Sequence, residues 1–154
     1  MSWLSNLELE KLIHKYGDDA TKKAFMGVYA IDTLPQSVPH LPALLIVNTD
    51  TKNLPGQHWK SIYITKERFG EVFDSLSGPI STLLSKWLNT FTRKWTYNTM
   101  VVQHPFSPTC GAFAAYFILT RLKNKSMKEF MRIYSRSLYK NSIMMQTFVK
   151  DLSE

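Results

Sequence analysis

The chain has 154 residues, of which 44% are hydrophobic and 20% charged, a composition typical of a folded protein with one packed core. Lysine and arginine exceed aspartate and glutamate by 19 to 12, which gives a net charge of +7. No apolar stretch approaches the roughly 20 residues needed to span a bilayer, and residues 1–10 lack a signal-peptide pattern. We therefore expect a single domain over residues 1–154 that is monomeric, is not secreted and does not bind a membrane.

The order of the predicted elements indicates an α+β fold. A helix is predicted over 5–16, and an irregular connection over 27–42 leads into a strand over 43–49. Aromatic and β-branched residues over 58–64 and 69–74 predict a β-hairpin. The remaining predicted elements are a helix over 79–88, a strand over 97–103, a helix beginning near Cys110, and helices near 126–137 and 141–152. This order favours a small mixed or antiparallel sheet packed against a central helix, with further helices beside it.

The predicted hairpin brings a histidine and a carboxylate together. A turn centred on Lys66 pairs residues whose numbers sum to 132, so His58 lies opposite Asp74. Opposed side chains have Cβ atoms about 4.5–5.5 Å apart, which lets the carboxylate fix the imidazole tautomer and stabilise the imidazolium. A register slip of one residue would break this pair. Glu71 is the rival carboxylate, which strand alternation points to the opposite face, and His104 is the rival general base.

Cys110 is the only cysteine, so the chain can form no intramolecular disulfide, which favours a reducing compartment. It stands at the start of a predicted helix, where unpaired N–H groups and the helix dipole favour a thiolate over a thiol. This placement suits a nucleophile. The alternative is a small buried hydrophobic residue.

Gln103 is a candidate for stabilising an oxyanion. It precedes Cys110 by seven residues, and Pro105 and Pro108 stiffen the loop between them. The Gln103 amide and the Cys110 backbone N–H are the expected donors, although Gln103 taken alone is more typical of a polar strand end. Trp59, next to His58, is expected either to form one wall of a substrate cleft or to lie in the core.

The chain has no CxxC pair, no HExxH motif and no phosphate-binding glycine loop, so we expect neither a metal nor a nucleotide. Basic residues are concentrated late in the sequence. Four of them recur at intervals of four and would form one stripe on a continuous helix, namely Lys128, Arg132, Arg136 and Lys140. Such a stripe binds nucleic-acid phosphates or is simply a solvated helix face.

The ordered residues His58-Trp59, Asp74, Gln103 and Cys110-Gly111 resemble the adenovirus endopeptidase (adenain-like) family of cysteine proteases, which includes enzymes of adenovirus-like large DNA transposons and viruses. The likeness covers residues 25–122 and includes the IVNT segment at 46–49 and Gly56. It implies the adenain and ubiquitin-like-protease clan fold and a Cys-His-Asp triad with a glutamine oxyanion donor.

The resemblance also implies a function. It predicts a viral or transposon-encoded cysteine endopeptidase that cleaves capsid or core precursor proteins during virion maturation, in the virion and in the host nucleus or cytoplasm. DNA and an activating peptide are the implied cofactors. Because the chain has no second cysteine, that peptide cannot be disulfide-linked as in adenovirus. The alternatives are a protease that removes SUMO or other ubiquitin-like modifiers, and a basic DNA-binding protein without enzymatic activity.

Overall fold

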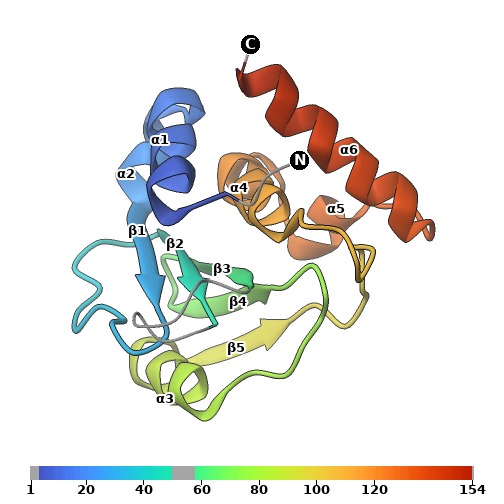
Figure 1. The fold of residues 1–154 in the computed structure, drawn as a ribbon. Coiled ribbons are helices and arrows are strands. Elements are labelled where there is room, and N and C mark those ends of the chain that lie inside the picture. Colours follow the sequence, from blue (N-terminus) through green and yellow to red (C-terminus); the bar gives the residue numbers. More distant parts are fainter. Residues whose placement is uncertain (1–3, 50–57, 154) are drawn as a thin grey trace.

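The chain folds as a mixed five-stranded sheet with helices on both faces (Figure 1). The computed structural model describes residues 4–49 and 58–153, so Gly56 lies outside the described residues. The elements in chain order are α1 (Asn6–Tyr16), α2 (Asp19–Ala24), β1 (Phe25–Ala30), β2 (Ala43–Asn48), β3 (Trp59–Ile64), β4 (Phe69–Phe73), α3 (Thr82–Phe91), β5 (Lys94–Tyr97), α4 (Cys110–Thr120), the 3₁₀ turn η1 (Arg121–Lys123), α5 (Met127–Met131) and α6 (Leu138–Ser153). The expected α+β class, with a central helix against a small sheet, is confirmed.

The strands lie in their sequence order, β1 to β5, with a parallel pair at each edge and antiparallel pairs in the centre. Every residue of β2 is buried, because its side chains alternate between two apolar cores. Leu44 and Ile46 pack beneath α4, whereas Leu45 and Val47 pack towards α3. The sheet is therefore the middle layer of three.

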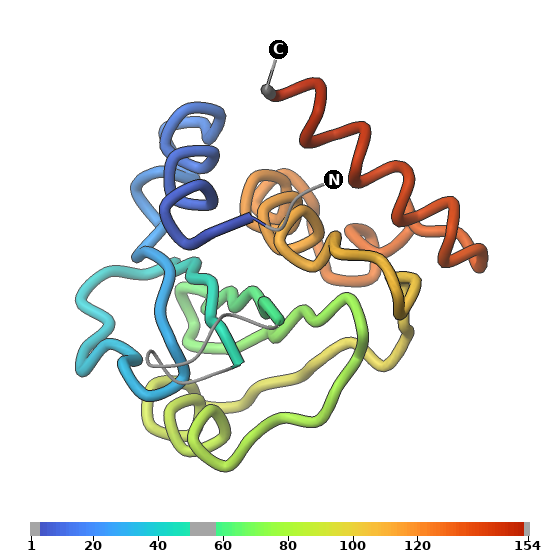
Figure 2. Tube along the Cα trace, in the orientation of Figure 1, coloured from blue at the N-terminus to red at the C-terminus, as the bar shows by residue number. Residues whose placement is uncertain are grey.

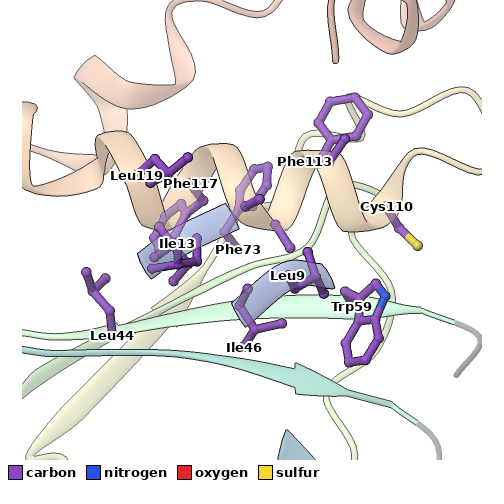
Figure 3. Packing of buried hydrophobic residues seen from close by; sticks show 14 of the residues in the cluster. Leu9, Ile13, Leu44, Ile46, Trp59, Phe73, Cys110, Phe113, Phe117 and Leu119 are labelled. Carbon is purple, nitrogen blue, oxygen red and sulfur yellow. The ribbon is translucent and has the colours of Figure 1, made fainter. Parts of the chain in front are cut away.

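Helix α4 is the central helix of the larger core. Nine of its eleven residues are buried, from Cys110 to Leu119, which accounts for the continuous apolar sequence CGAFAAYFILT. Figure 3 shows α4 lying along the sheet, with Phe117 towards the middle of the helix and Cys110 at its first turn, on the side where Trp59 lies. This packing fixes the start of α4 at one end of strands β3 and β4.

The hairpin forms, but its predicted register was wrong. Ile64 pairs with Gly70 and Ser61 pairs with Phe73, so paired numbers sum to 134. The turn runs from Thr65 to Phe69, with Arg68 donating to the Thr65 carbonyl and adopting a φ of 69°. A three-residue loop with a left-handed residue at its end is a common hairpin geometry, and it moves the centre of the turn by one residue.

Several element boundaries also differ from expectation. The last strand covers Lys94–Tyr97 rather than 97–103, and the helix expected from Pro79 begins at Thr82, after the N-cap Ser81. Helix α2 and strand β1 were not predicted, and the irregular connection expected over 27–42 starts only after Ala30. Among the described residues, no helix is both long and apolar enough to cross a membrane.

Two connections meet at the edge of the sheet beside the start of α4. Residues 74–81 follow β4, and residues 98–109 lead into α4; their traces run together at this edge in Figure 2. The backbone N–H groups of Val102 and Gln103 both donate to the Ser75 carbonyl, at 2.9 and 3.0 Å. The segment after β4 and the loop before α4 are therefore joined directly.

Candidate active site

Cys110 is the first residue of α4 and is almost fully buried. Thr109 is the N-cap residue, but its side chain makes no capping hydrogen bond and instead pairs with the Ser107 hydroxyl at 2.8 Å. The first N–H groups of α4 therefore keep their donor capacity at the thiol end of the helix. This is the helix start that the sequence predicted.

His58 precedes β3 directly, and Asp74 follows β4 directly. The His58 Nε2 atom contacts Asp74 Oδ1, and the Cys110 side chain is near enough to the ring to raise the pKa of His58. Because Nε2 is used by the carboxylate, Nδ1 is the ring nitrogen left for Cys110. The structure thus brings Cys110, His58 and Asp74 into one chain of contacts.

The contact between His58 and Asp74 forms despite the wrong register. A change of two in the paired sum keeps every side chain on its predicted face, so the two residues become diagonal neighbours instead of direct opposites. Diagonal pairs remain within reach of long or aromatic side chains. Glu71 points to the other face, as alternation predicted, and makes a two-fold ion pair with Arg121 at 2.7 and 2.9 Å.

The Asp74 carboxylate is held by its own turn and by a buried lysine. Oδ1 accepts from the Leu76 N–H at 2.9 Å, and Oδ2 accepts from the Gly78 N–H at 2.8 Å. Lys60 Nζ lies 3.4 Å from Oδ2 and donates to the Pro79 carbonyl at 2.8 Å. Only 4% of Lys60 is exposed, so its charge acts on Asp74 with little screening by water.

The pKa values of the two residues are pushed apart. Burial lowers the pKa of His58, but hydrogen bonds and charge from Asp74 and Cys110 outweigh it and raise this pKa from 6.5 to about 9. Burial raises the pKa of Asp74, whereas His58, the Leu76 N–H and Lys60 outweigh it and lower the pKa to about 2. At neutral pH the pair is therefore an imidazolium and a carboxylate.

The Gln103 carboxamide is buried and held at both ends. Ser75 Oγ donates to Gln103 Oε1 at 2.5 Å, and Gln103 Nε2 donates to the Ser107 carbonyl at 2.7 Å. An amide nitrogen carries two hydrogens, so one N–H remains beyond the bond to Ser107. Gln103 does not end a strand, because β5 stops at Tyr97. It lies in the loop that leads into α4 and its first residue, Cys110.

The other candidate residues lie elsewhere. Trp59 is 5% exposed and belongs to the core that contains Cys110, which favours its core role over a cleft wall. His104 Nδ1 accepts from the Phe106 N–H at 3.3 Å. An open groove of about 350 Å³ lies beside this loop and is lined by residues including Phe106, Tyr139 and Ile143.

The basic stripe does not form on one helix. Helix α5 ends at Met131, and α6 begins at Leu138, so the four residues fall on two helices and the turn between them. Ser135 and Asn141 cause this break, because the Asn141 side chain accepts from the Ser135 N–H and donates to its carbonyl, both at 2.9 Å. All four basic residues are exposed: Lys128, Arg132, Arg136 and Lys140. The condition for a single stripe, one helix through all four residues, is therefore not met, and nucleic-acid binding by these residues stays a prediction.

Sequence reasoning missed Lys60 and Ser75. The signal for Lys60 was available, since strand alternation places it on the same face as His58 and Asp74. Ser75 gives no such signal, because its partner Gln103 is 28 residues away. Within residues 4–49 and 58–153, no three His, Cys, Asp or Glu side chains are grouped so that they could hold a metal ion.

Comparison with solved structures finds the same fold in other proteins. The ASFV pS273R protease is similar with a TM-score of 0.65 and 15% sequence identity, over 92% of this chain and 65% of that one. This chain thus spans just under two thirds of that protease. The central domain of the uncharacterized Lpg1148 protein of Legionella pneumophila is similar with a TM-score of 0.57 and 12% identity, over 99% and 97% of the two chains.

A further similar structure is the SUMO protease Ulp1, with a TM-score of 0.49 and 14% identity over 99% of this chain and 80% of that one. No protein-family model and no curated protein sequence matches the chain. At these identities the likeness is one of fold, and it agrees with the fold that the sequence resemblance implied.

Proposed function

We propose that this chain is a cysteine endopeptidase with Cys110 as nucleophile, His58 as general acid and base, and Asp74 as the residue that orients His58. The observation that carries the proposal is the position of His58, which contacts Asp74 through Nε2 and lies close enough to Cys110, the first residue of a buried helix, for that side chain to raise the pKa of His58. A nucleophile, a base in hydrogen-bond reach and a third group orienting the base form the arrangement of covalent catalysis. The likeness of the fold to a viral protease supports the same function.

In the proposed reaction, the Cys110 thiolate forms a bond from Sγ to the substrate carbonyl carbon, and the carbonyl π electrons move to oxygen. The Cys110 N–H and the second N–H of Gln103 Nε2 stabilise that oxyanion. Collapse restores the carbonyl and breaks the C–N bond, while His58 donates its Nδ1 proton to the leaving amine. Neutral His58 then takes a proton from water, hydroxide attacks the thioester, and the thiolate leaves as the imidazolium is restored.

The substrates we propose are polypeptide precursors of a capsid or core, cut after small residues such as glycine. This part of the proposal is supported by the sequence resemblance and by the viral protease among the structural neighbours. The alternative is a deconjugating protease for ubiquitin-like modifiers. It would use the same catalytic residues, and its substrates would also be cut after glycine, because such modifiers end in glycine. DNA and a peptide activator belong to the same proposal.

A substrate panel tests the proposal. We expect the chain, with and without DNA, to cleave precursor-derived peptides after small residues, and Cys110→Ala and His58→Ala to remove turnover while near-UV circular dichroism stays unchanged. Cleavage of ubiquitin-like conjugates with no cleavage of precursors would replace the substrate assignment by deconjugation. Full retention of every function in Cys110→Ser would reject the enzyme and favour a DNA-binding protein.

A further inference from the structure

Ser75, the residue after Asp74, is joined to Gln103 by side chain and backbone together. Its hydroxyl donates to Gln103 Oε1 at 2.5 Å, and its carbonyl accepts from the N–H groups of Val102 and Gln103 at 2.9 and 3.0 Å. Ser75 is 1% exposed and Gln103 is 2% exposed, so water does not compete for these bonds. The segment that carries Asp74 is therefore fastened to the residue that faces the reacting carbonyl in the proposed reaction.

The neighbours of Gln103 determine which way its amide points. The Ser107 carbonyl can only accept a hydrogen bond, so the group 2.7 Å from it must be the amide nitrogen. Oε1 then faces Ser75, and the hydroxyl must act as the donor. With Oε1 and one N–H occupied in this way, the second N–H is the one group of the carboxamide left to donate to another partner.

We propose that Ser75 is a positioning residue for the oxyanion site: its hydroxyl holds the Gln103 carboxamide in the orientation that presents the second N–H to the oxyanion. The inference rests on the proposed function and assigns a residue that the reaction described above does not use. Without the hydroxyl, Oε1 is a buried acceptor that has lost its donor, and rotation of the amide towards another partner becomes favourable. Loss of orientation then weakens the donor in the transition state.

The loss of kcat expected in Ser75→Ala follows from the role of Gln103 as an oxyanion donor. Removing a whole oxyanion donor costs about 10²–10³ in kcat, so misplacing one by Ser75→Ala is expected to cost about 10- to 100-fold. The loss is expected in kcat and not in KM, because the oxyanion exists only after attack. Alkylation of Cys110 by iodoacetamide forms an S–C bond and releases iodide without an oxyanion. Its rate and pH profile are expected to stay as in the wild type.

A double-mutant cycle with Gln103 separates positioning from a merely structural role. If Ser75 acts through Gln103, the kcat of Ser75→Ala combined with Gln103→Ala equals that of Gln103→Ala alone. Multiplied losses in the double variant would overturn the proposal, and so would unchanged kcat in Ser75→Ala. Ser77→Ala is the matched control. Ser77 lies in the same turn as Ser75, but its hydroxyl donates to the Asn98 carbonyl and not to Gln103, so this variant is expected to leave kcat unchanged.

A second pair of variants keeps the test decisive if Ser75→Ala does not fold. Thr and Val side chains have nearly the same shape and differ by the hydroxyl, so we expect turnover to be kept in Ser75→Thr and to be about 10- to 100-fold lower in Ser75→Val. Equal turnover in the two would overturn the proposal. Failure of the proposed function has another signature, since wild type would then cleave no substrate or Cys110→Ala would remain active.

Discussion

Lys60 and Asp74 lie across the hairpin from each other, with the lysine ammonium 3.4 Å from the carboxylate oxygen that His58 does not contact. The register observed for β3 and β4, continued by one residue, places the two side chains in direct opposition. The carboxylate thus lies between two cationic groups, His58 on one oxygen and Lys60 on the other. Lys60 offsets part of the negative charge that holds the proton on His58.

Replacing Lys60 by methionine is expected to move the alkaline limb of turnover to higher pH. Without the ammonium, the Asp74 carboxylate attracts the His58 proton more strongly, so the imidazolium persists further into alkaline solution. The measurement is the pH dependence of kcat/KM. Lys66→Met, an exposed lysine in the hairpin turn, is the control and leaves the limb in place. A limb that moves equally in both variants, or in neither, would contradict the assigned role of Lys60.

Turnover is expected to decline as the pH rises through about 9, because His58 then loses the proton that the leaving amine needs. In Asp74→Asn the hydrogen bond to an anionic partner is lost, while burial continues to lower the pKa of His58. The decline therefore moves to lower pH. Asp151→Asn, on the exposed face of α6, serves as the control. If the alkaline decline of turnover had the same midpoint in Asp74→Asn as in the wild type, His58 would not be the titrating group.

The same pair makes stability depend on pH in two directions. The pKa of His58 is raised to about 9 in the folded chain, so its contribution is complete below 6.5 and is lost as the pH rises towards 9. The pKa of Asp74 is lowered from 3.8 to about 2, so its contribution is present above 3.8 and is lost as the pH falls towards 2. We expect the free energy of unfolding in urea to fall between pH 6.5 and 9 in the wild type and to fall less in His58→Gln. Identical declines in the two proteins would be the contrary result.

The sequence predicted the contact between His58 and Asp74 better than it predicted the register. Alternation in a strand determines the face of each side chain, and the predicted faces are correct although the predicted centre of the turn was wrong by one residue. The error came from Arg68, which adopts a left-handed φ without being glycine or asparagine. Local sequence gives little warning of that conformation in an arginine.

The misplaced last strand has a cause outside its own sequence. Tyr97 to Val102 has strand-like composition, but the Asn98 side chain accepts from the Asp74 N–H at 2.8 Å and donates to its carbonyl at 2.7 Å. The N–H groups of Val102 and Gln103 then turn to the Ser75 carbonyl. These partners are more than 20 residues away in the chain, so only tertiary structure identifies them. By contrast, the start of α6 has a local signal, because the Ser137 hydroxyl accepts from the Lys140 N–H at 3.2 Å, as the N-cap residue of a helix does.

Glu71, the carboxylate on the other face of the hairpin, provides a last test that separates stability from catalysis. Its ion pair with Arg121 is two-fold, and Arg121 is 4% exposed and stacks 4.8 Å from the centre of the Tyr63 ring. Removing one member of a buried pair costs about 3–5 kcal/mol, because the other charge stays buried without its partner. We expect Glu71→Leu, which leaves the buried Arg121 without its carboxylate partner, to lower the free energy of unfolding by about that amount, and Glu71→Leu with Arg121→Met to recover most of it. Urea denaturation measures both.

In every variant of this pair that folds, the pH profile of Cys110 alkylation should match that of the wild type, because Glu71 faces away from His58. A shifted profile would make Glu71 part of the catalytic site.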